Sequence, residues 1–293
     1  MKLLVIGGSG LLGNAILEKS NFSFDVLSTY NNNKIGIPNT QSHHISLPSD
    51  FDKLRSLLND RRPDVVINTA AYSNVDFCES NKEEAYLLNT KIAGEIASIC
   101  SQVNSKLIFI SSDYVFDGTK GNYSEDDKPS PMNYYGHTKK LAEELILKSS
   151  RNTVIRTSII YGLDKRVRFL NFVVNNLKKG EEVLAYNDIF QSPILIDEIV
   201  ESILKVAISD MTGIFHVSGS SCVNKFDFAK IIAEHFGFDE NLVKPISVKN
   251  AHTKGLKPGK LCLDNTKAKK TFNINFSTIE EGVRMISNKS SND

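Results

Sequence analysis

A phenol and an amine lie four positions apart in the stretch NYYGHTKK, residues 133–140, where Tyr135 and Lys139 open a helical pattern. On a helix, residues i and i+4 are neighbours on one face, so the lysine ammonium can lie close to the phenolic oxygen. A nearby cation favours the phenolate and lowers the pKa of the phenol, which suits proton transfer near neutral pH. Because such pairs also arise by chance on surface helices, the pair indicates acid catalysis only where other features agree.

A glycine-rich stretch, GGSGLLG at residues 7–13, follows the first apolar run of the chain. Its first glycine, Gly7, permits a tight turn, Gly10 lets the backbone approach a pyrophosphate, and Gly13 allows a helix to pack close to the strand. The pyrophosphate is then expected at the positive N-terminus of that helix. The sequence therefore predicts a dinucleotide site formed by Gly7, Gly10, Leu11, Leu12 and Gly13.

The residues after the second apolar run bear on which dinucleotide binds. An acid at this place usually holds the ribose hydroxyls of NAD and repels a 2′-phosphate. Between Val26 and Ser49 the chain has no Asp or Glu, and Asp25 is expected in solvent at the start of its strand. The polar groups there are instead Thr29, Tyr30, Asn31 and Lys34. We expect NADPH as the cofactor, with NADH as an alternative.

Strand-like and helical patterns alternate through the first half of the chain, beginning with KLLVIG and GLLGNAILEKS. This alternation is typical of an α/β fold in which helices cover both faces of a parallel sheet. We predict a Rossmann-type doubly wound sheet in residues 1–162 and 187–218, with GIFHVSG returning to it as a strand. Residues 163–186 and 219–293 are predicted to form a smaller substrate-binding lobe.

Bulk composition favours an enzyme that acts on a small substrate. The 293 residues carry 35 Lys and Arg against 34 Asp and Glu, a formal charge of +1. This near balance gives no strong electrostatic field that would attract nucleic acid or a membrane surface. No apolar run is long enough for a membrane span, so a cytoplasmic protein is expected. The histidines, including a pair in a polar loop at His43 and His44, have no metal-ligand spacing, and no metal site is predicted. The four cysteines, which are far apart, are expected to be reduced thiols: Cys78, Cys100, Cys222 and Cys262.

Several further stretches make the chain resemble the extended short-chain dehydrogenase/reductase family. They include PDVVINTAAYSNVDFCES, SSDYVFDG, YGHTK, RTSIIYG and LDNTKAKK. Within that family the chain is similar to the branch that reduces the 4-keto group of nucleotide-linked deoxy sugars. The resemblance implies that Tyr135 protonates the ketone oxygen while hydride arrives from the nicotinamide, that Lys139 supports the phenol and binds the nicotinamide ribose, and that Ser112 hydrogen-bonds the carbonyl.

The resemblance also assigns residues to the two binding regions. Besides the glycine loop, Tyr135 and Lys139, the cofactor region is expected to include Thr29, Ala70, Ala71, Tyr72, Ser111 and Ser158. The substrate region is expected to include Val75, Ser112, Asp113, Tyr135 and Ile159. Asp113 is expected to anchor its loop or the substrate, and Asn89 either orients groups near the triad or is a buried, satisfied amide.

Two departures from family patterns bear on the function. Sugar-nucleotide dehydratases of the family carry Thr-Asp-Glu where this chain has Ser112, Asp113 and Tyr114, and the missing glutamate argues against dehydration. Ile159 stands where relatives have tryptophan, so the identity of the sugar stays open. An epimerase, or an NADP-binding regulatory subunit of another enzyme, remains an alternative to a reductase. A homodimer is implied by the family alone.

Overall fold

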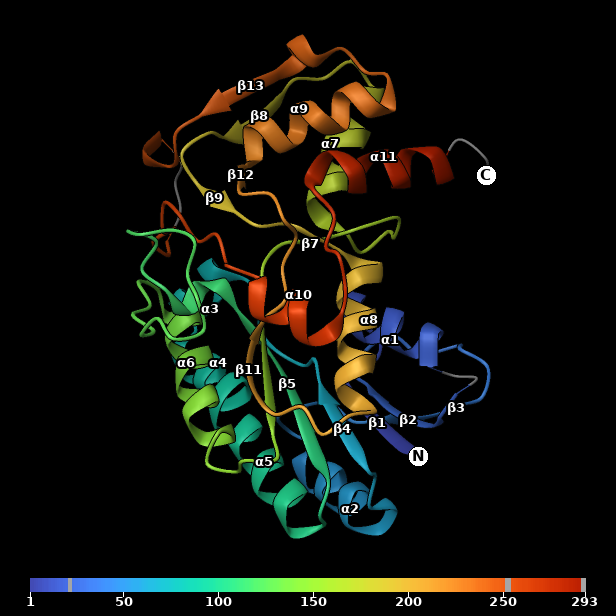
Figure 1. Ribbon diagram of the computed structural model, residues 1–293. Helices are drawn as coiled ribbons and strands as arrows, with labels where there is room; N and C mark the ends of the chain where they lie inside the picture. Colours follow the sequence, from blue (N-terminus) through green and yellow to red (C-terminus); the bar gives the residue numbers. More distant parts are fainter. Residues whose placement is uncertain (21–22, 251–253, 291–293) are drawn as a thin grey trace.

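A seven-stranded sheet forms the centre of the molecule in the computed structural model, which describes residues 1–20, 23–250 and 254–290. Every pair of neighbouring strands in it is parallel, and the order is β11-β6-β5-β4-β1-β2-β3 (Figure 1). The order reverses direction at β1 and β4, which is where dinucleotide sites occur in doubly wound sheets. The strands are β1 Lys2–Ile6, β2 Asp25–Tyr30, β3 Thr40–His44, β4 Val65–Asn68, β5 Lys106–Ser112, β6 Thr153–Thr157 and β11 Gly213–His216.

The inner strands read as near-continuous apolar runs because helices cover both of their faces. Val65–Asn68 and Thr153–Thr157 are buried throughout their length. The predicted return of GIFHVSG to the sheet is confirmed, because β11 pairs with β6. The prediction of a polar loop at His43 and His44 is wrong: both residues lie in β3, an edge strand that is polar because it is only partly covered.

Helices cover the two faces of the sheet, as predicted for a doubly wound fold. One face packs against α1 (Leu11–Ser20), α8 (Ile196–Ala207) and α10 (Thr266–Phe272). The other packs against α2 (Phe51–Arg61), α5 (Ala93–Gln102) and α6 (Tyr134–Ile146). Shorter helical segments connect these elements: α3 Val75–Ser80, α4 Lys82–Tyr86, the π-helical η1 Leu87–Ile92 and the 3₁₀ turn η2 Asp113–Val115.

A second hydrophobic core lies beyond the carboxyl ends of the strands, at the top of Figure 1. It is built from α7 (Arg168–Lys178), α9 (Lys225–Phe236) and α11 (Ile279–Ser290), with the parallel pair β8 (Val183–Tyr186) and β13 (Val243–Ile246). The remaining short elements are β7 Ile160–Tyr161, β9 Phe190–Gln191, β10 Ile194–Leu195, β12 Val223–Asn224, η3 Glu240–Leu242 and η4 Val248–Asn250.

The exact division of the chain between the two lobes stays a prediction. Near the C-terminus, Ala268, Phe272 and Phe276 pack into the core beside the sheet, whereas Ile279 and Val283 belong to the second core. Within the part of the chain that the structure describes, none of the helices combines the length and apolar character that crossing a bilayer needs.

Candidate functional site

The glycine loop makes a tight turn between β1 and α1. Gly7 has φ of +85°, and a Cβ there would lie 2.9 Å from Thr69 Oγ1 and 3.1 Å from the backbone nitrogen of Ala70. A Cβ on Gly13 would collide with the carbonyl oxygen of Gly7. Only glycine fits at these two positions, so the N-terminus of α1 opens directly over the end of β1. This arrangement suits a pyrophosphate, which binds backbone N–H groups at a helix N-terminus.

A cavity of about 260 Å³ lies beside this loop. Thr29 supports the loop from β2: its Oγ1 accepts from the Gly7 N–H at 3.2 Å, and its carbonyl accepts from the Gly8 N–H at 2.9 Å. The cavity lies at the point where the strand order reverses, so the residues present fit a dinucleotide. The predicted cofactor residues among its lining are Gly7, Gly10, Thr29, Ala70, Ala71 and Tyr72.

Tyr135 lies in the first turn of α6, and the local sequence determines where that helix begins. Asn133 caps the helix, because its Oδ1 accepts from the Gly136 N–H at 2.9 Å. Gly136 lets α6 lie close to the backbone at Tyr114, since a Cβ on Gly136 would collide with the carbonyl oxygen of Tyr114. This approach brings the Tyr135 side chain within hydrogen-bonding reach of Ser112, at the end of β5.

Burial dominates the protonation of both members of the Tyr135–Lys139 pair. Burial raises the pKa of the Tyr135 phenol, and the hydrogen bond with Ser112 opposes this rise only in part. The net shift of the phenol pKa is therefore upward, opposite to the lowering expected from the lysine, because burial is its largest cause. Burial also lowers the pKa of Lys139 to about 7, against the charge of Glu143. The Lys139 ammonium donates to the Ile110 carbonyl at 2.6 Å and lies 3.9 Å from the centroid of the Phe109 ring.

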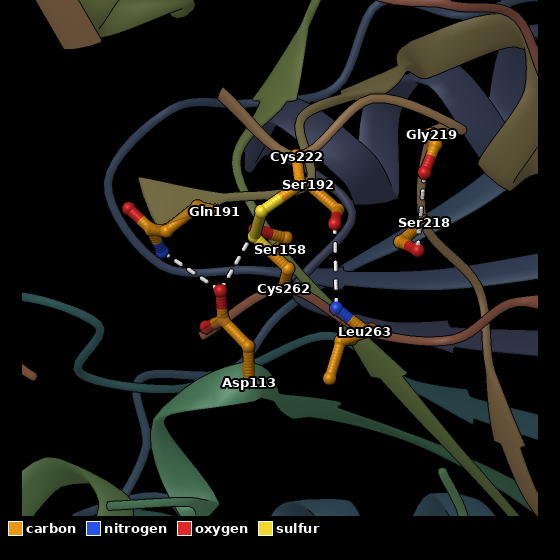
Figure 2. Close-up of a disulfide and its surroundings, with 9 residues drawn as sticks. All are labelled: Asp113, Ser158, Gln191, Ser192, Ser218, Gly219, Cys222, Cys262 and Leu263. Carbon is orange, nitrogen blue, oxygen red and sulfur yellow. Dashed lines mark hydrogen bonds between the residues drawn. A yellow bond between two sulfur atoms is a disulfide. The ribbon is translucent and has the colours of Figure 1, made fainter. Parts of the chain in front are cut away.

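Asp113 is the centre of a hydrogen-bond network beside the phenol. Its Oδ1 accepts from Ser112 Oγ at 3.0 Å. Its Oδ2 accepts from Ser158 Oγ and from Gln191 Nε2, both at 2.7 Å (Figure 2). Burial raises the pKa of the Asp113 carboxyl to about 6, and the three side-chain donors oppose that rise. Asp113 thus orients the Ser112 hydroxyl, and Ser158 is part of the same network.

A second buried network lies behind Lys139. Glu143, one helical turn after the lysine, accepts from Ser111 Oγ at 2.5 Å and from Arg156 Nη2 at 2.7 Å. The Glu143 and Arg156 side chains are 3% and 2% exposed, and His216 Nε2 lies 3.3 Å from Arg156 Nη1. The Ser111 hydroxyl, predicted to border the nicotinamide, is directed at this carboxylate. Sequence reasoning missed Glu143, although its spacing from Lys139 places it on the same helix face.

Asn89 joins the segment that follows β4 to helix α6. Its Oδ1 accepts from the Tyr72 N–H at 2.8 Å, and its Nδ2 donates to the Tyr72 carbonyl at 3.0 Å and to Thr138 Oγ1 at 3.1 Å. The amide is therefore buried and satisfied, and it also positions the backbone of Tyr72. Of the predicted substrate residues, Val75 begins α3 close to Gly255, while Ile159 packs partly against the second core.

The prediction of four reduced thiols is wrong for two of them, because Cys222 and Cys262 form a disulfide. Their Cα atoms are 5.5 Å apart although 40 positions separate them in the sequence. The bond joins the segment between β11 and β12 to the segment before α10, in the surroundings of Gln191 and Ser158 (Figure 2). Cys78 and Cys100 are free and buried.

Comparisons with known proteins agree with this geometry. A probable low-salt glycan biosynthesis reductase, Agl14, of Haloferax volcanii is 29% identical over 290 residues, covering 97% of this chain and 96% of the relative. Methionine adenosyltransferase 2 subunit beta of Xenopus laevis is 30% identical over 260 residues, covering 84% of this chain and 75% of the relative. A crystal structure of a hypothetical dTDP-4-dehydrorhamnose reductase from Sulfolobus tokodaii is similar with a TM-score of 0.86 at 34% identity, covering 96% of this chain and 99% of that one.

The fold and the glycine loop are those that the resemblance to extended short-chain dehydrogenases/reductases implies. A family model described as the RmlD substrate binding domain matches residues 1–291, nearly the whole chain. This protein therefore belongs to the RmlD substrate binding domain family.

Proposed function

We propose that this protein reduces the 4-keto group of a nucleotide-linked deoxy sugar with NADPH, as an enzyme similar to dTDP-4-dehydrorhamnose reductase. One observation carries the proposal: Ser112, Tyr135 and Lys139 come together from β5 and α6 at the same end of the sheet as the glycine loop. A nicotinamide cofactor bound at that loop supplies the hydride for such a reduction.

The protein's own residues supply the proton and hold the reacting oxygen. The raised pKa of Tyr135 keeps the phenol protonated, so it is ready to donate to the developing alkoxide. Ser112 donates its hydroxyl proton to Asp113 in this structure, and turning that O–H toward the substrate would give the oxygen a second hydrogen bond. Lys139, charged below about pH 7, places a cation on the same helix face as the phenol. Residue 114 is Tyr rather than Glu, so no carboxylate stands there to remove a proton beside the ketone, which disfavours dehydration.

NADPH is the cofactor that the β2 end favours. Thr29 accepts a hydrogen bond from the glycine loop. Asn31, which is uncharged, lines the cavity at the place where an acid would repel the 2′-phosphate of NADPH. NADH remains the alternative, because none of the described residues that line the cavity is a lysine or an arginine that could pair with a 2′-phosphate.

The experiment that tests the function is a panel of nucleotide-linked 4-keto-6-deoxy sugars, mixed with the protein and NADPH, with NADPH absorbance as the readout. We expect oxidation of NADPH with at least one sugar, and chromatography of the product should show the reduced 4-hydroxyl. Because Ile159 stands where relatives have tryptophan, the panel should include sugars other than the rhamnose precursor. Silence across the panel with tight NADPH binding would overturn the reductase.

A second candidate function is an NADP-binding regulatory subunit. The 30% identity to a subunit of methionine adenosyltransferase supports it. In that case a pull-down recovers a stoichiometric partner enzyme, and Tyr135→Phe leaves the effect on that partner unchanged. An epimerase, which shares Ser112, Tyr135 and Lys139, is distinguished by an isomerised sugar without net NADPH consumption.

A homodimer and a cytoplasmic location complete the proposal. Light scattering on the purified protein tests the dimer. Because structural disulfides are rare in most cytoplasmic proteins, cell fractionation combined with thiol trapping of Cys222 and Cys262 tests the location.

A further inference from the structure

Two lysines from segments far apart in the sequence meet at the ring of Tyr186, the last residue of β8. Lys225 Nζ lies 5.8 Å from the centroid of that ring, and Lys257 Nζ lies 5.3 Å from it. Lys225 also lies 5.5 Å from the centroid of the Phe169 ring. Within the described residues, neither ammonium group has a hydrogen-bond acceptor or an ion-pair partner.

This pair of cations is electrostatically incomplete. Burial lowers the pKa of Lys225, and the charge of Lys257 lowers it further, while Asp113 opposes both effects from the active site. A partly buried ammonium without an ion-pair partner is unfavourable, and a second ammonium nearby adds repulsion. Lys225 is also the first residue of the 12-residue helix α9, whose N-terminus carries partial positive charge. An anion is the ligand that removes all three unfavourable contributions.

The segments that carry the two lysines are held in place. Lys225 follows β12, which pairs with β9, so that Val223 is opposite Gln191. The Lys257 segment is fastened where the Gly259 carbonyl accepts from the Phe190 N–H at 2.7 Å. The Cys222–Cys262 disulfide then links the two segments directly. The lysines therefore sit on a fixed frame.

The strand β9, which holds the segments of both lysines, also contacts the catalytic groups. Gln191 in β9 donates to Asp113 at 2.7 Å, and Asp113 accepts from Ser112 at 3.0 Å. The lysine pair is thus connected to the reacting end of the site through one strand pair and one carboxylate. A substrate whose sugar lies at Ser112 and Tyr135 can extend its anionic part toward Tyr186.

We propose that Lys225 and Lys257 bind the diphosphate of the nucleotide-sugar substrate, with the Tyr186 ring packed against the adjoining nucleoside. This inference rests on the proposed function and assigns its substrate-binding cations. Two ammonium groups match the charge of a diphosphate, and an aromatic ring offers a flat surface to a base or ribose.

The test measures binding of dTDP and UDP alone, by calorimetry, to protein saturated with NADP⁺. Lys225→Met and Lys257→Met are each expected to weaken the binding about 10-fold, and the double variant about 100-fold, from the loss of hydrogen bonds to a charged group. Lys225→Arg and Lys257→Arg should retain most of the affinity. Lys230→Met is the matched control, because Lys230 lies on the same helix but pairs with Glu240 at 3.4 Å, and it should bind as the unchanged protein does.

The affinity for NADPH separates this site from the cofactor site. We expect it to change less than about 2-fold in every lysine variant, since neither lysine lines the cavity beside the glycine loop. Equal losses for NADPH and the nucleoside diphosphates would overturn the inference. Unchanged dTDP and UDP binding in the double variant, or no binding to the starting protein, would overturn it as well.

The two proposals fail in distinguishable ways. If the lysine variants lose affinity for nucleoside diphosphates but no sugar in the panel is reduced, the anion site is supported and the reductase activity is contradicted. If the double variant reduces a sugar with the same KM as the unchanged protein, the reductase activity is supported and the lysine site is contradicted.

Discussion

Removing the Cys222–Cys262 disulfide should lower both the stability of the protein and its affinity for the substrate. The bond closes a loop of 40 positions, and the restriction of the unfolded chain by such a loop contributes about 4 kcal/mol to the free energy of unfolding. It also joins the segments that carry Lys225 and Lys257. We therefore expect Cys222→Ser with Cys262→Ser to lose about 4 kcal/mol and to bind dTDP or UDP more weakly, with NADPH affinity retained.

Urea unfolding followed by far-ultraviolet circular dichroism measures the stability, since the chain has no tryptophan to report by fluorescence. Treating the starting protein with a thiol reductant should reproduce the loss, because Cys222 is exposed to solvent. The same reductant should leave the double variant unchanged. Burial raises the pKa of Cys78 to about 11 and that of Cys100 to about 12, so these thiols are poor nucleophiles and should not confuse the comparison.

Two results would refute this reasoning. One is four titratable thiols in the denatured protein without any reductant, which would mean that the disulfide is absent. The other is a double variant that loses less than about 1 kcal/mol, well below the chain-entropy contribution of a loop of this length.

Three further predictions concern other parts of the site. Glu143→Gln should lower the free energy of unfolding by about 3–5 kcal/mol in urea titrations, because it leaves the Arg156 charge buried and unpaired; a loss below about 1 kcal/mol contradicts this. Turnover should be highest between about pH 6 and 7. The Asp113 carboxyl, whose pKa burial raises to about 6, is charged above pH 6, and Lys139, whose pKa burial lowers to about 7, is charged below pH 7. Asp113→Asn should abolish the acidic limb of the pH profile, and an unchanged limb would show that another group causes it. Fluorescence titration should show NADPH binding at least as tightly as NADH, and Asn31→Asp should shift the preference toward NADH by about 10-fold, or 1.4 kcal/mol; a tenfold NADH preference in the starting protein contradicts the assignment.

Local patterns were enough to predict the central sheet and the phosphate loop. The spacing of Gly7, Gly10 and Gly13 reflects steric needs that act within a few residues, and the structure has those contacts. The strand at GIFHVSG was predictable for a similar reason, because a short apolar run between turn residues suits a covered strand. Edge strand β3 escaped prediction, since a half-exposed strand of polar residues has neither an apolar run nor an alternation.

Contacts between distant segments account for what the sequence did not reveal. Cys222 and Cys262 show no pairing motif, and only the approach of the β11–β12 connection to the segment before α10 brings them together. The donation from Gln191 to Asp113 depends in the same way on β9 returning over the end of β5. Burial also decided the direction of the pKa shift of Tyr135, and the degree of burial is a property of the assembled fold.

The most direct test of the central claim compares single-turnover rates of NADPH oxidation, with a reducible nucleotide-linked 4-keto sugar, in two neighbouring variants. Tyr135→Phe removes the proposed proton donor, whereas Tyr134→Phe removes the adjacent phenol on α6, which contacts Lys82 and His137 rather than Ser112. We predict a loss of about 10²- to 10⁴-fold for Tyr135→Phe, with NADPH affinity retained, and less than about 3-fold for Tyr134→Phe. Equal rates in the two variants would contradict the assignment of Tyr135 as the acid.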